Sequence, residues 1–547
     1  MSVQRVMGTE TEYAVSQAGT RHYQPVQLSF DVVAAATTEG NRHIRWDYRQ
    51  EDPVNDARGT RLDRAAARPD MLTDSPQLNI TNVIAPNGGR IYVDHAHPEY
   101  SAPETTDPFQ AVTYDHAGDR LMLAAARQAS HNTGHAIELH RNNVDGKGAS
   151  WGTHENYMMQ RAVPFDDVAG LMTAHFISRQ IWAGSGRVGI GEHSEIAGYQ
   201  LSQRADYIHA KIGLQTTFDR PIINTRDEPH ATGAYRRLHV IVGDANRMDT
   251  PQVLKLGVTS MLLWTLEHAD EAGYDMRGLI EGLRLADPVE AMHTVSHDLS
   301  LNAELALEYG GTITAWQMQV RLRGAVYAVA ASVLGTDTKG EPAWEDRQTR
   351  NVMAMWGQAL ADTAAIRHAS DDERLALHAE AGRVEWLLKW QLLEKMRRRL
   401  GGAEWNDPRL AAIDLSWAAL DPARSIYAKV ASHTERIVDD AQLDHAASNA
   451  PENTRAWLRA ELVRRFPEQI VAASWSHITV RKADSLSHEL DVTYGNASAA
   501  QSHGFRQEDL VSLDMSDPLA FGKAQAAAFV DDAVDAAQAL GAIAGRS

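Results

Sequence analysis

The stretch from residue 89 to residue 101 constrains the fold of this chain most strongly, because polar and apolar side chains alternate along it. Successive side chains of a β-strand point to opposite faces of its sheet. The apolar pair is Ile91 and Val93, and the polar residues between and beside them are Arg90, Tyr92 and Asp94. The pattern predicts a strand that ends at Pro98 and carries three polar side chains on one face.

An acidic pair near the start of the chain follows the same spacing. In an extended segment Glu10 and Glu12 lie on one face, about 7 Å apart, a spacing suited to a hard divalent cation. A solvated strand face is the alternative for this pair, and turn chemistry is the alternative for Asp94. Apolar Val6, Met7 and Tyr13 flank the pair and favour the site.

The whole-chain composition excludes several classes of protein. The 53 basic and 72 acidic residues give a net charge of -19, which disfavours nucleic acid as the main partner but allows a local basic pocket for phosphates. No apolar run approaches the about 18 residues of a membrane span, and no leader opens the chain, so we expect a cytoplasmic protein. With no cysteine, disulfides, thiolate zinc sites and cysteine nucleophiles are excluded.

Residues 45–75 are highly charged and lack apolar periodicity. A stretch of about 30 residues with little structure of its own is uncommon between strands unless it is functional or disordered. We interpret it as a mobile loop near the site, with a plain surface insertion as the alternative.

Histidine and arginine residues mark further candidates. His154 follows a turn-rich run, and a single histidine is more often structural than a ligand, but His239 provides a second one. Guanidinium groups bind phosphate oxygens bidentately. The following arginines would converge on phosphates if paired strands separate them, and would otherwise form surface ion pairs: Arg204, Arg226 and Arg237.

Helical periodicity dominates the rest of the chain up to residue 466. The predicted helices span residues 108–129, 253–267, 371–400 and 451–466. Short strands are predicted within 470–480 and at 489–494, and an Ala-rich helix at 518–544. We therefore predict a catalytic domain over residues 1–468 and a small C-terminal domain over 469–547.

Several of these runs together resemble one family. Residues 8–13, 90–101, 142–157, 224–230 and 472–475 are similar to motifs of the depupylase/deamidases of Pup, the prokaryotic ubiquitin-like protein. With the Pup ligases, these enzymes form part of the carboxylate-amine ligase branch of the glutamine synthetase superfamily. Without the resemblance, the residues indicate only a metal- and phosphate-binding α+β enzyme.

The resemblance implies an α+β fold in which a curved antiparallel sheet forms a cradle, with helices behind it and a small C-terminal domain. It implies ATP, or ADP plus phosphate, at one end of the cradle, with Mg²⁺ between the phosphates and the sheet. The implied metal-site residues are Glu10, Tyr92 and Glu99, with His154 and His239 reaching metal or phosphate and Glu12 and Glu155 as further candidates. The implied nucleotide-site residues are Arg90, Arg204, Arg226 and Arg237 for the phosphates and Trp475 for the adenine.

Asp94 is the candidate for the chemistry. Without a cysteine or an evident Ser-His-Asp set, amide hydrolysis needs a carboxylate, either as nucleophile or as base for water. The sequence leaves both roles open. The resemblance implies cleavage of the isopeptide bond between Pup and a substrate lysine, and conversion of a C-terminal Gln of Pup to Glu, with ATP as a cofactor not consumed at each turnover. The implied partners are Pup and pupylated proteins, and the expected state is a monomer.

Two alternatives are a Pup ligase and a non-catalytic Pup-binding regulator. The insertion at residues 52–59 and the spacing from Asp94 to Pro98 resemble the hydrolase rather than the ligase. Intact Asp94, Glu10 and Glu99 argue against a regulator, which has no chemical need for them.

Overall fold

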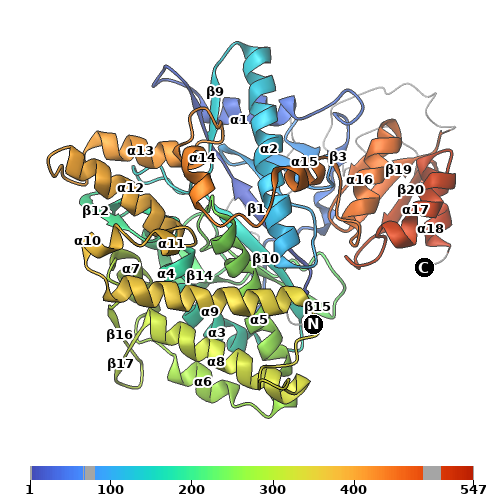
Figure 1. The fold of residues 1–547 in the computed structure, drawn as a ribbon. Helices are drawn as coiled ribbons and strands as arrows, with labels where there is room; N and C mark the ends of the chain where they lie inside the picture. Colours follow the sequence, from blue (N-terminus) through green and yellow to red (C-terminus); the bar gives the residue numbers. More distant parts are fainter. Residues whose placement is uncertain (1–2, 64, 66, 68–79, 484–506, 546–547) are drawn as a thin grey trace.

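A computed structural model of the 547-residue chain describes all of it except residues 1–2, 64, 66, 68–79, 484–506 and 546–547 (Figure 1). Its centre is a sheet of six strands in the order β15-β10-β1-β8-β7-β6, and every neighbouring pair is antiparallel. The strands are β15 (Tyr235–Val240), β10 (Thr153–Gln160), β1 (Met7–Glu12), β8 (His97–Ser101), β7 (Arg90–Asp94) and β6 (Asn82–Ile84).

The stretch 89–101 forms a hairpin rather than one strand. β7 and β8 pair with Asp94 opposite His97, and His95 in the turn adopts a left-handed backbone with φ 51°. The prediction that the strand ends at Pro98 is therefore wrong, because the chain reverses earlier and Pro98 lies within β8. Pro98 lacks an amide hydrogen, but its carbonyl accepts a hydrogen bond from the amide of Tyr13, which joins β8 to the segment after β1.

Helices cover the back of the sheet, as the apolar faces of its strands require. Ile91 of β7 and Tyr100 of β8 pack in one core cluster with α1 (Pro25–Ala35) and α2 (Pro108–Thr133). At the other end, Tyr157 of β10 and Leu238 of β15 belong to a larger cluster with α3 (Phe165–Ser178) and α5 (Asp249–Ala272). The predicted helices 108–129 and 253–267 correspond to α2 and α5 and are confirmed.

The cap residues of α2 are those expected from the physics of helix ends. Asp107 accepts hydrogen bonds from the amides of Phe109 and Gln110, Pro108 begins the helix, and Gly134 ends it with φ 73°. The long helix is thus fixed at both ends behind β1.

The remaining elements surround this core. The other helices are α4 (Gln180–Ala183), α6 (Met276–Gly282), α7 (Pro288–His297), α8 (Ala315–Leu334), α9 (Arg347–His368), α13 (Pro408–Ala418), α14 (Ile426–Val430) and α15 (Asp440–Ser448). The two-stranded pairs are β2 (Ala14–Gln17) with β9 (Ile137–His140), β4 (Asn55–Asp56) with β5 (Thr60–Arg61), β11 (Arg187–Ile190) with β12 (Ile196–Gln200), β13 (Ile208–Gly213) with β14 (Arg220–Asn224), and β16 (Glu304–Ala306) with β17 (Thr312–Thr314).

The predicted single helix at 371–400 is wrong. The segment forms α10 (Asp371–Arg374), α11 (His378–Ala381) and α12 (Glu385–Arg399). The side-chain amide of Gln391 donates hydrogen bonds to the carbonyls of Arg374 and Leu377, at 2.7 and 3.1 Å. These contacts tie α12 to the end of α10 and to the residue before α11, in addition to the backbone hydrogen bonds that the same carbonyls accept.

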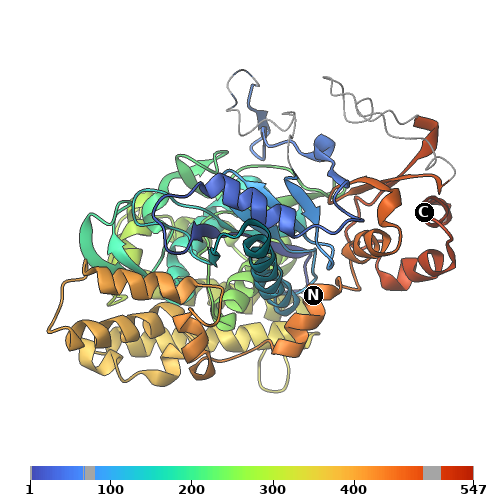
Figure 2. The ribbon, with the colours of Figure 1, turned by 90° about the horizontal axis from the view of Figure 1, so that it is seen from above.

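The C-terminal part of the chain forms a separate sheet that stands to one side of the cradle (Figures 1 and 2). Its strands run in the order β20-β19-β18-β3, where β18 (Ile470–Ala473), β19 (His477–Arg481) and β20 (Leu510–Asp514) are joined by β3 (Arg45–Trp46) from the N-terminal part. α16 (Ala456–Arg465), α17 (Lys523–Asp532) and α18 (Ala536–Ala544) share its apolar core.

Predictions for this C-terminal part had mixed outcomes. The helices at 451–466 and 518–544 exist, but the first begins later and the second is two helices, α17 and α18. The predicted strand at 489–494 lies outside the described residues. The domain boundary at 469 stays a prediction; the apolar cluster of the C-terminal sheet also contains Leu458 and Leu462 of α16.

The mixed helical and antiparallel architecture confirms the α+β class. Among the described residues, no helix combines the length and hydrophobicity needed to cross a membrane.

Candidate active site

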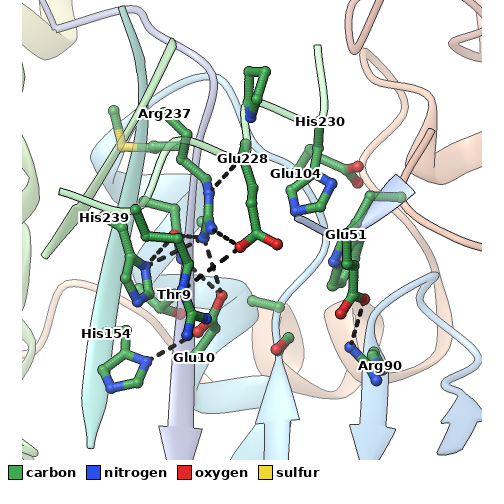
Figure 3. A pocket seen from close by; sticks show the side chains of 18 of the residues that line it. Thr9, Glu10, Glu51, Arg90, Glu104, His154, Glu228, His230, Arg237 and His239 are labelled. Carbon is green, nitrogen blue, oxygen red and sulfur yellow. Dashed lines mark hydrogen bonds and ion pairs between the residues drawn. The ribbon is translucent and has the colours of Figure 1, made fainter. Parts of the chain in front are cut away.

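A cavity of about 410 Å³ lies over the polar face of the central sheet (Figure 3). Strands β1, β7, β8, β10 and β15 contribute to its lining, together with the segment after β14 and residues of the C-terminal part. It is lined by all residues of the predicted site except Arg204 and the further candidates Glu12 and Glu155, namely Glu10, Arg90, Tyr92, Asp94, Glu99, His154, Arg226, Arg237, His239 and Trp475. The strand alternation at residues 90–94 thus placed Arg90, Tyr92 and Asp94 correctly.

One end of the cavity holds a cluster of Glu10, His154 and His239, whose potential ligand atoms lie within 4.8 Å of one another. Nδ1 of His154 lies 3.0 Å from Glu10, and the amide of Asn156 donates to Glu10 at 3.1 Å. Burial raises the pKa of Glu10, but the His154 hydrogen bond and nearby positive charge outweigh it and hold this pKa below its usual range. Burial and Arg237 lower the pKa of His239, which keeps the imidazole neutral, as a metal ligand must be.

A second cluster consists of Glu12, Asp94 and Glu99. Burial raises the pKa of Glu99 well above its ordinary value, and the charges of Asp94, Glu12 and Glu10 raise it further. One carboxylate oxygen of Glu99, Oε1, is buried and has no hydrogen-bond partner within the described parts of the chain. A cation would satisfy this oxygen and relieve the repulsion between the carboxylates.

The two clusters fit a hard divalent cation. Their donors are carboxylate oxygens and imidazole nitrogens, and Tyr92 lies opposite Glu99 in the β7–β8 pair and can add its phenol oxygen. This oxygen-rich set suits Mg²⁺ better than zinc.

Asp94 lies at the end of β7, beside the hairpin turn. Its carboxylate is 2.9 Å from Nδ1 of His95, and its side chain is 37% exposed. Burial raises the pKa of Asp94, but the His95 hydrogen bond and the positive charges around it outweigh burial and lower this pKa. Asp94 is therefore an ionised carboxylate accessible from the cavity.

Arg226, from the segment after β14, and Arg237 of β15 also line the cavity. Arg237 donates to Asn156 at 2.7 Å and pairs with Glu228 at 3.2 Å (Figure 3). Arg226 lies 3.7 Å from the same glutamate, and its Nε donates no hydrogen bond within the described residues. Arg226 can therefore bind an anionic ligand through Nε, whereas Arg237 must first exchange hydrogen bonds, because its Nε also donates to the carbonyl of Glu228 at 2.8 Å.

Arg90 is placed differently from these two. Its guanidinium lies between the rings of Trp46 and Tyr92, 4.1 and 4.0 Å from their centroids. It also donates to Asn82 at 2.5 Å and to the hydroxyl of Tyr48 at 3.1 Å. Arg90 lines the cavity, but most of its binding capacity is used within the protein.

Arg204 and Glu155 are not brought to the cavity. Arg204 is buried and donates to the carbonyls of Trp151 and Ile241, at 2.6 and 3.0 Å. Glu155 is buried in an ion pair with Arg179 at 2.5 Å, on the other face of β10 from His154. We correct both predictions accordingly: these two residues hold loops and strands together behind the site.

Sequence reasoning missed several residues that line the cavity, namely Glu51, Glu104, Glu228, His230 and Arg455. Glu228 and His230 lie inside the run 224–230 and could have been included from it. Glu104 and Arg455 pair at 2.7 Å across 351 positions of sequence, so no local pattern signals them.

The charged segment 45–75 does reach the site, as predicted, because Tyr48, Glu51 and Pro53 line the cavity. The amide of Ala57 donates to the carbonyl of Thr225, and the amide of Asp227 donates to the carbonyl of Asn55. The segment therefore pairs with the chain that carries Arg226. Its mobility stays a prediction, and residues 64, 66 and 68–75 of it lie outside the described residues.

Sequence comparisons identify relatives over most of the chain. The model of a family described as Pup-ligase protein matches residues 5–479. The Pup deamidase/depupylase of Mycolicibacterium smegmatis is 42% identical over 484 residues, which cover 87% of this chain and 91% of that protein. The Pup–protein ligase of Sanguibacter keddieii is 34% identical over 493 residues, covering 87% of this chain and 93% of the ligase.

Two solved structures are similar in fold. The complex between Pup and its ligase PafA superposes with a TM-score of 0.71 at 25% identity, covering 99% of this chain and 92% of the ligase chain. The Pup ligase PafA in complex with ADP gives a TM-score of 0.65 at 28% identity, covering 82% of this chain and 88% of that one.

Proposed function

Because the chain belongs to the Pup-ligase family, we propose that it is a depupylase and Pup deamidase. Its α+β cradle is that of the glutamine-synthetase-like Pup ligases. The observation that carries the proposal is Asp94, an ionised and accessible carboxylate beside a cluster of metal-type ligands. Hydrolysis of an amide by a cysteine-free chain needs such a group.

The reaction adds water across an amide bond. The substrate is the isopeptide bond between the side-chain carboxyl of the C-terminal Glu of Pup and a lysine, or the side-chain amide of a C-terminal Gln. The products are the Glu carboxylate and either the free lysine amine or ammonia. Asp94 either attacks the carbonyl, giving a mixed anhydride that water opens, or takes a proton from the attacking water.

The remaining cavity residues support this step. Arg226 and Arg237 provide positive charge that can stabilise an oxyanion or hold phosphates. His95 hydrogen-bonds Asp94 and helps to keep its carboxylate ionised.

The chain binds a nucleotide, which we propose to be ATP, or ADP plus phosphate, acting as a cofactor; a relative of the same fold binds ADP. Arg226 and Arg237 would hold its phosphates, with Arg90 at the edge of the cavity, and Trp475 would stack on the adenine. Glu10, Tyr92, Glu99, His154 and His239 would hold Mg²⁺, with Glu12 close to them. Bound Mg²⁺ supplies electrostatic stabilisation of negative charge on phosphate or carbonyl oxygen.

The Pup ligase is the second candidate. Relatives named Pup–protein ligase match this chain, but at lower identity than the deamidase/depupylase over a similar share of it. A non-catalytic regulator is disfavoured, because the carboxylate clusters and Asp94 are intact.

The test is incubation of the purified protein with a Pup-conjugated substrate, ATP and Mg²⁺. Wild type should release free Pup and intact target, and should convert a C-terminal Gln of Pup to Glu, as read by gel and mass spectrometry. D94A and D94N should lose at least about a thousandfold in rate, as expected when the group that forms or breaks the bond is removed. D166N, at an exposed position on α3 outside the cavity, is the matched control and should keep full activity.

ATP-driven attachment of Pup to a target, without release, would instead identify a ligase. Hydroxylamine added during turnover distinguishes the two roles of Asp94. A nucleophilic Asp94 gives a hydroxamate on Asp94 when hydroxylamine opens the anhydride at that carbonyl, whereas an Asp94 that acts as general base is left unmodified.

A further inference from the structure

A buried ion-pair cluster joins α16 to the rim of the cavity. Glu104, which follows β8 and lines the cavity, accepts hydrogen bonds from Arg455 at 2.7 Å and from Arg459 at 2.5 Å. The Arg459 side chain is fully buried and that of Arg455 is 3% exposed. Burying two guanidinium groups beside one carboxylate costs folding free energy unless good geometry and further hydrogen bonds offset the lost solvation. Each of the two guanidinium groups does donate further hydrogen bonds.

Arg459 also contacts Trp475 in two ways. Its Nη1 donates to the carbonyl of Trp475 at 3.1 Å, and its guanidinium carbon lies 5.0 Å from the centroid of the indole ring. A third donor, Nε, binds the carbonyl of Gly88 at 2.9 Å, in the turn between β6 and β7. One side chain therefore ties Trp475 to the cradle through Gly88 and Glu104.

Trp475 depends on such contacts for its orientation. It lies in the turn between β18 and β19, outside both strands. In the described part of the chain, its aromatic and cationic neighbours are Trp46, in an edge-on arrangement at 5.1 Å, and Arg459. Trp46 lies in the two-residue strand β3, so Arg459 is the neighbour anchored on a helix.

We propose that Arg459, held by Glu104, is a positioning residue that sets the indole of Trp475 as the platform for the base of a bound nucleotide. The inference rests on the proposed function, because it takes the nucleotide base to stack on Trp475. Arg459 itself touches no ligand; it acts through Trp475. A lysine at this position keeps the charge but not the planar fork that serves Glu104, Gly88 and the ring at once.

The proposal predicts a loss of affinity that depends on the base. A base stacked on an aromatic side chain contributes about tenfold or more to binding. The full-length protein with Mg²⁺ is titrated with ATP and, separately, with inorganic triphosphate, which has phosphates but no base. W475A and R459K should each raise the Kd for ATP about tenfold and leave the Kd for triphosphate unchanged.

A matched control lies on the same helix. Arg464 pairs with Glu461 at the surface and is 67% exposed, so R464K should change neither Kd. The double variant W475A/R459K should bind ATP no more weakly than W475A alone, because Arg459 acts through the ring. If R459K fails to fold, E104Q gives the same base-dependent loss through the weakened anchor.

Three results would overturn the inference. They are an equal loss of ATP and triphosphate affinity in R459K, unchanged ATP affinity in either R459K or W475A, and additive losses in the double variant. Failure of the proposed function would give a different experimental result. Wild type would then release no Pup, whereas the base-dependent binding pattern would still test the platform.

Discussion

At the residue scale, the surroundings of two carboxylates, Glu10 and Glu99, shift their pKa values in opposite directions. Hydrogen bonds and positive charge hold the pKa of Glu10 below its ordinary value. Burial and the surrounding carboxylates raise the pKa of Glu99. Without a cation, Glu99 therefore keeps a proton to higher pH than Glu10 does, and a cation that binds Glu99 competes with that proton.

The first prediction concerns this proton. Mg²⁺ binding should strengthen as pH rises and should release a proton, because the raised pKa of Glu99 favours its protonated form in the metal-free protein. In that metal-free state a raised carboxyl pKa stabilises the fold below the unfolded pKa, and this contribution is lost as pH rises through the folded pKa. Calorimetric titration with Mg²⁺ in buffers of different ionisation enthalpy counts the released protons.

E99Q is the informative variant for this count. It should bind Mg²⁺ at least about tenfold more weakly, as loss of a carboxylate ligand implies, and should release fewer protons. Proton release equal to that of wild type would show that another group carries the proton.

The sequence predicted the cavity residues well where local pattern decides orientation. Strand alternation put Arg90, Tyr92 and Asp94 on one face, and the structure agrees. Arg204 and Arg226 look alike in sequence, yet Arg204 turns inward to bind two carbonyls. Which buried carbonyls need a donor depends on how distant segments pack, and a local pattern carries no such information.

At the element scale, α2 holds β1 in position, and β1 is the strand that carries Glu10 and Glu12. Asp115 of α2 accepts hydrogen bonds from the hydroxyls of Thr9 at 2.9 Å and Thr11 at 3.3 Å. Its other oxygen pairs with buried Arg141. Because Thr9 and Thr11 alternate with the two glutamates, their anchorage behind the sheet positions the carboxylates in front of it.

The second prediction tests this anchorage. D115N should lower the free energy of unfolding by about 3–5 kcal/mol, because it leaves Arg141 with one fewer charged partner in the core. T9V removes one hydrogen bond and should cost about 1 kcal/mol, with weaker Mg²⁺ binding. Denaturant unfolding and calorimetric titration with Mg²⁺ measure the two effects.

T113V on the same helix is the control, because the hydroxyl of Thr113 donates to the carbonyl of Phe109, one turn earlier in α2. It should lower stability by a similar small amount without changing Mg²⁺ affinity. Equal changes in metal affinity for T9V and T113V would contradict the anchoring role.

The elements themselves were predictable to the extent that their causes are local. Asp107, Pro108 and Gly134 delimit α2 in the sequence. The break within the segment 371–400 was not predictable from the sequence, because it involves the contact of Gln391 with the carbonyls of Arg374 and Leu377. A periodic apolar pattern continues across such a break, since the helices on both sides still face one core.

At the scale of the whole molecule, the C-terminal sheet is completed by a strand from the other end of the chain. β3 pairs with β18 in parallel, and Ile44 and Ile84 lie in the apolar core of this sheet. The C-terminal part is therefore joined to the cradle by backbone pairing, apolar contact and the cluster of Glu104 with Arg455 and Arg459. The residues in these contacts are far apart in the sequence, so no local pattern predicts the contacts. The sequence did predict strands in the C-terminal part.

The third prediction is that this joint weakens in acid. Burial raises the pKa of Glu104, but Arg459 and Arg455 outweigh it and lower the pKa from 4.5 to about 2. The stabilisation is therefore present above the unfolded pKa and is lost as pH falls through the folded pKa. A difference of this size corresponds to about 3 kcal/mol. The Tm of E104Q should lie below that of wild type near pH 7, and the gap should close as pH falls from about 5 toward about 2.

E461Q, which breaks a surface pair on the same helix, should shift stability by less than about 1 kcal/mol. A gap for E104Q that stays constant over this pH range would show that Glu104 acts through packing, and that charge does not hold the C-terminal part against the cradle.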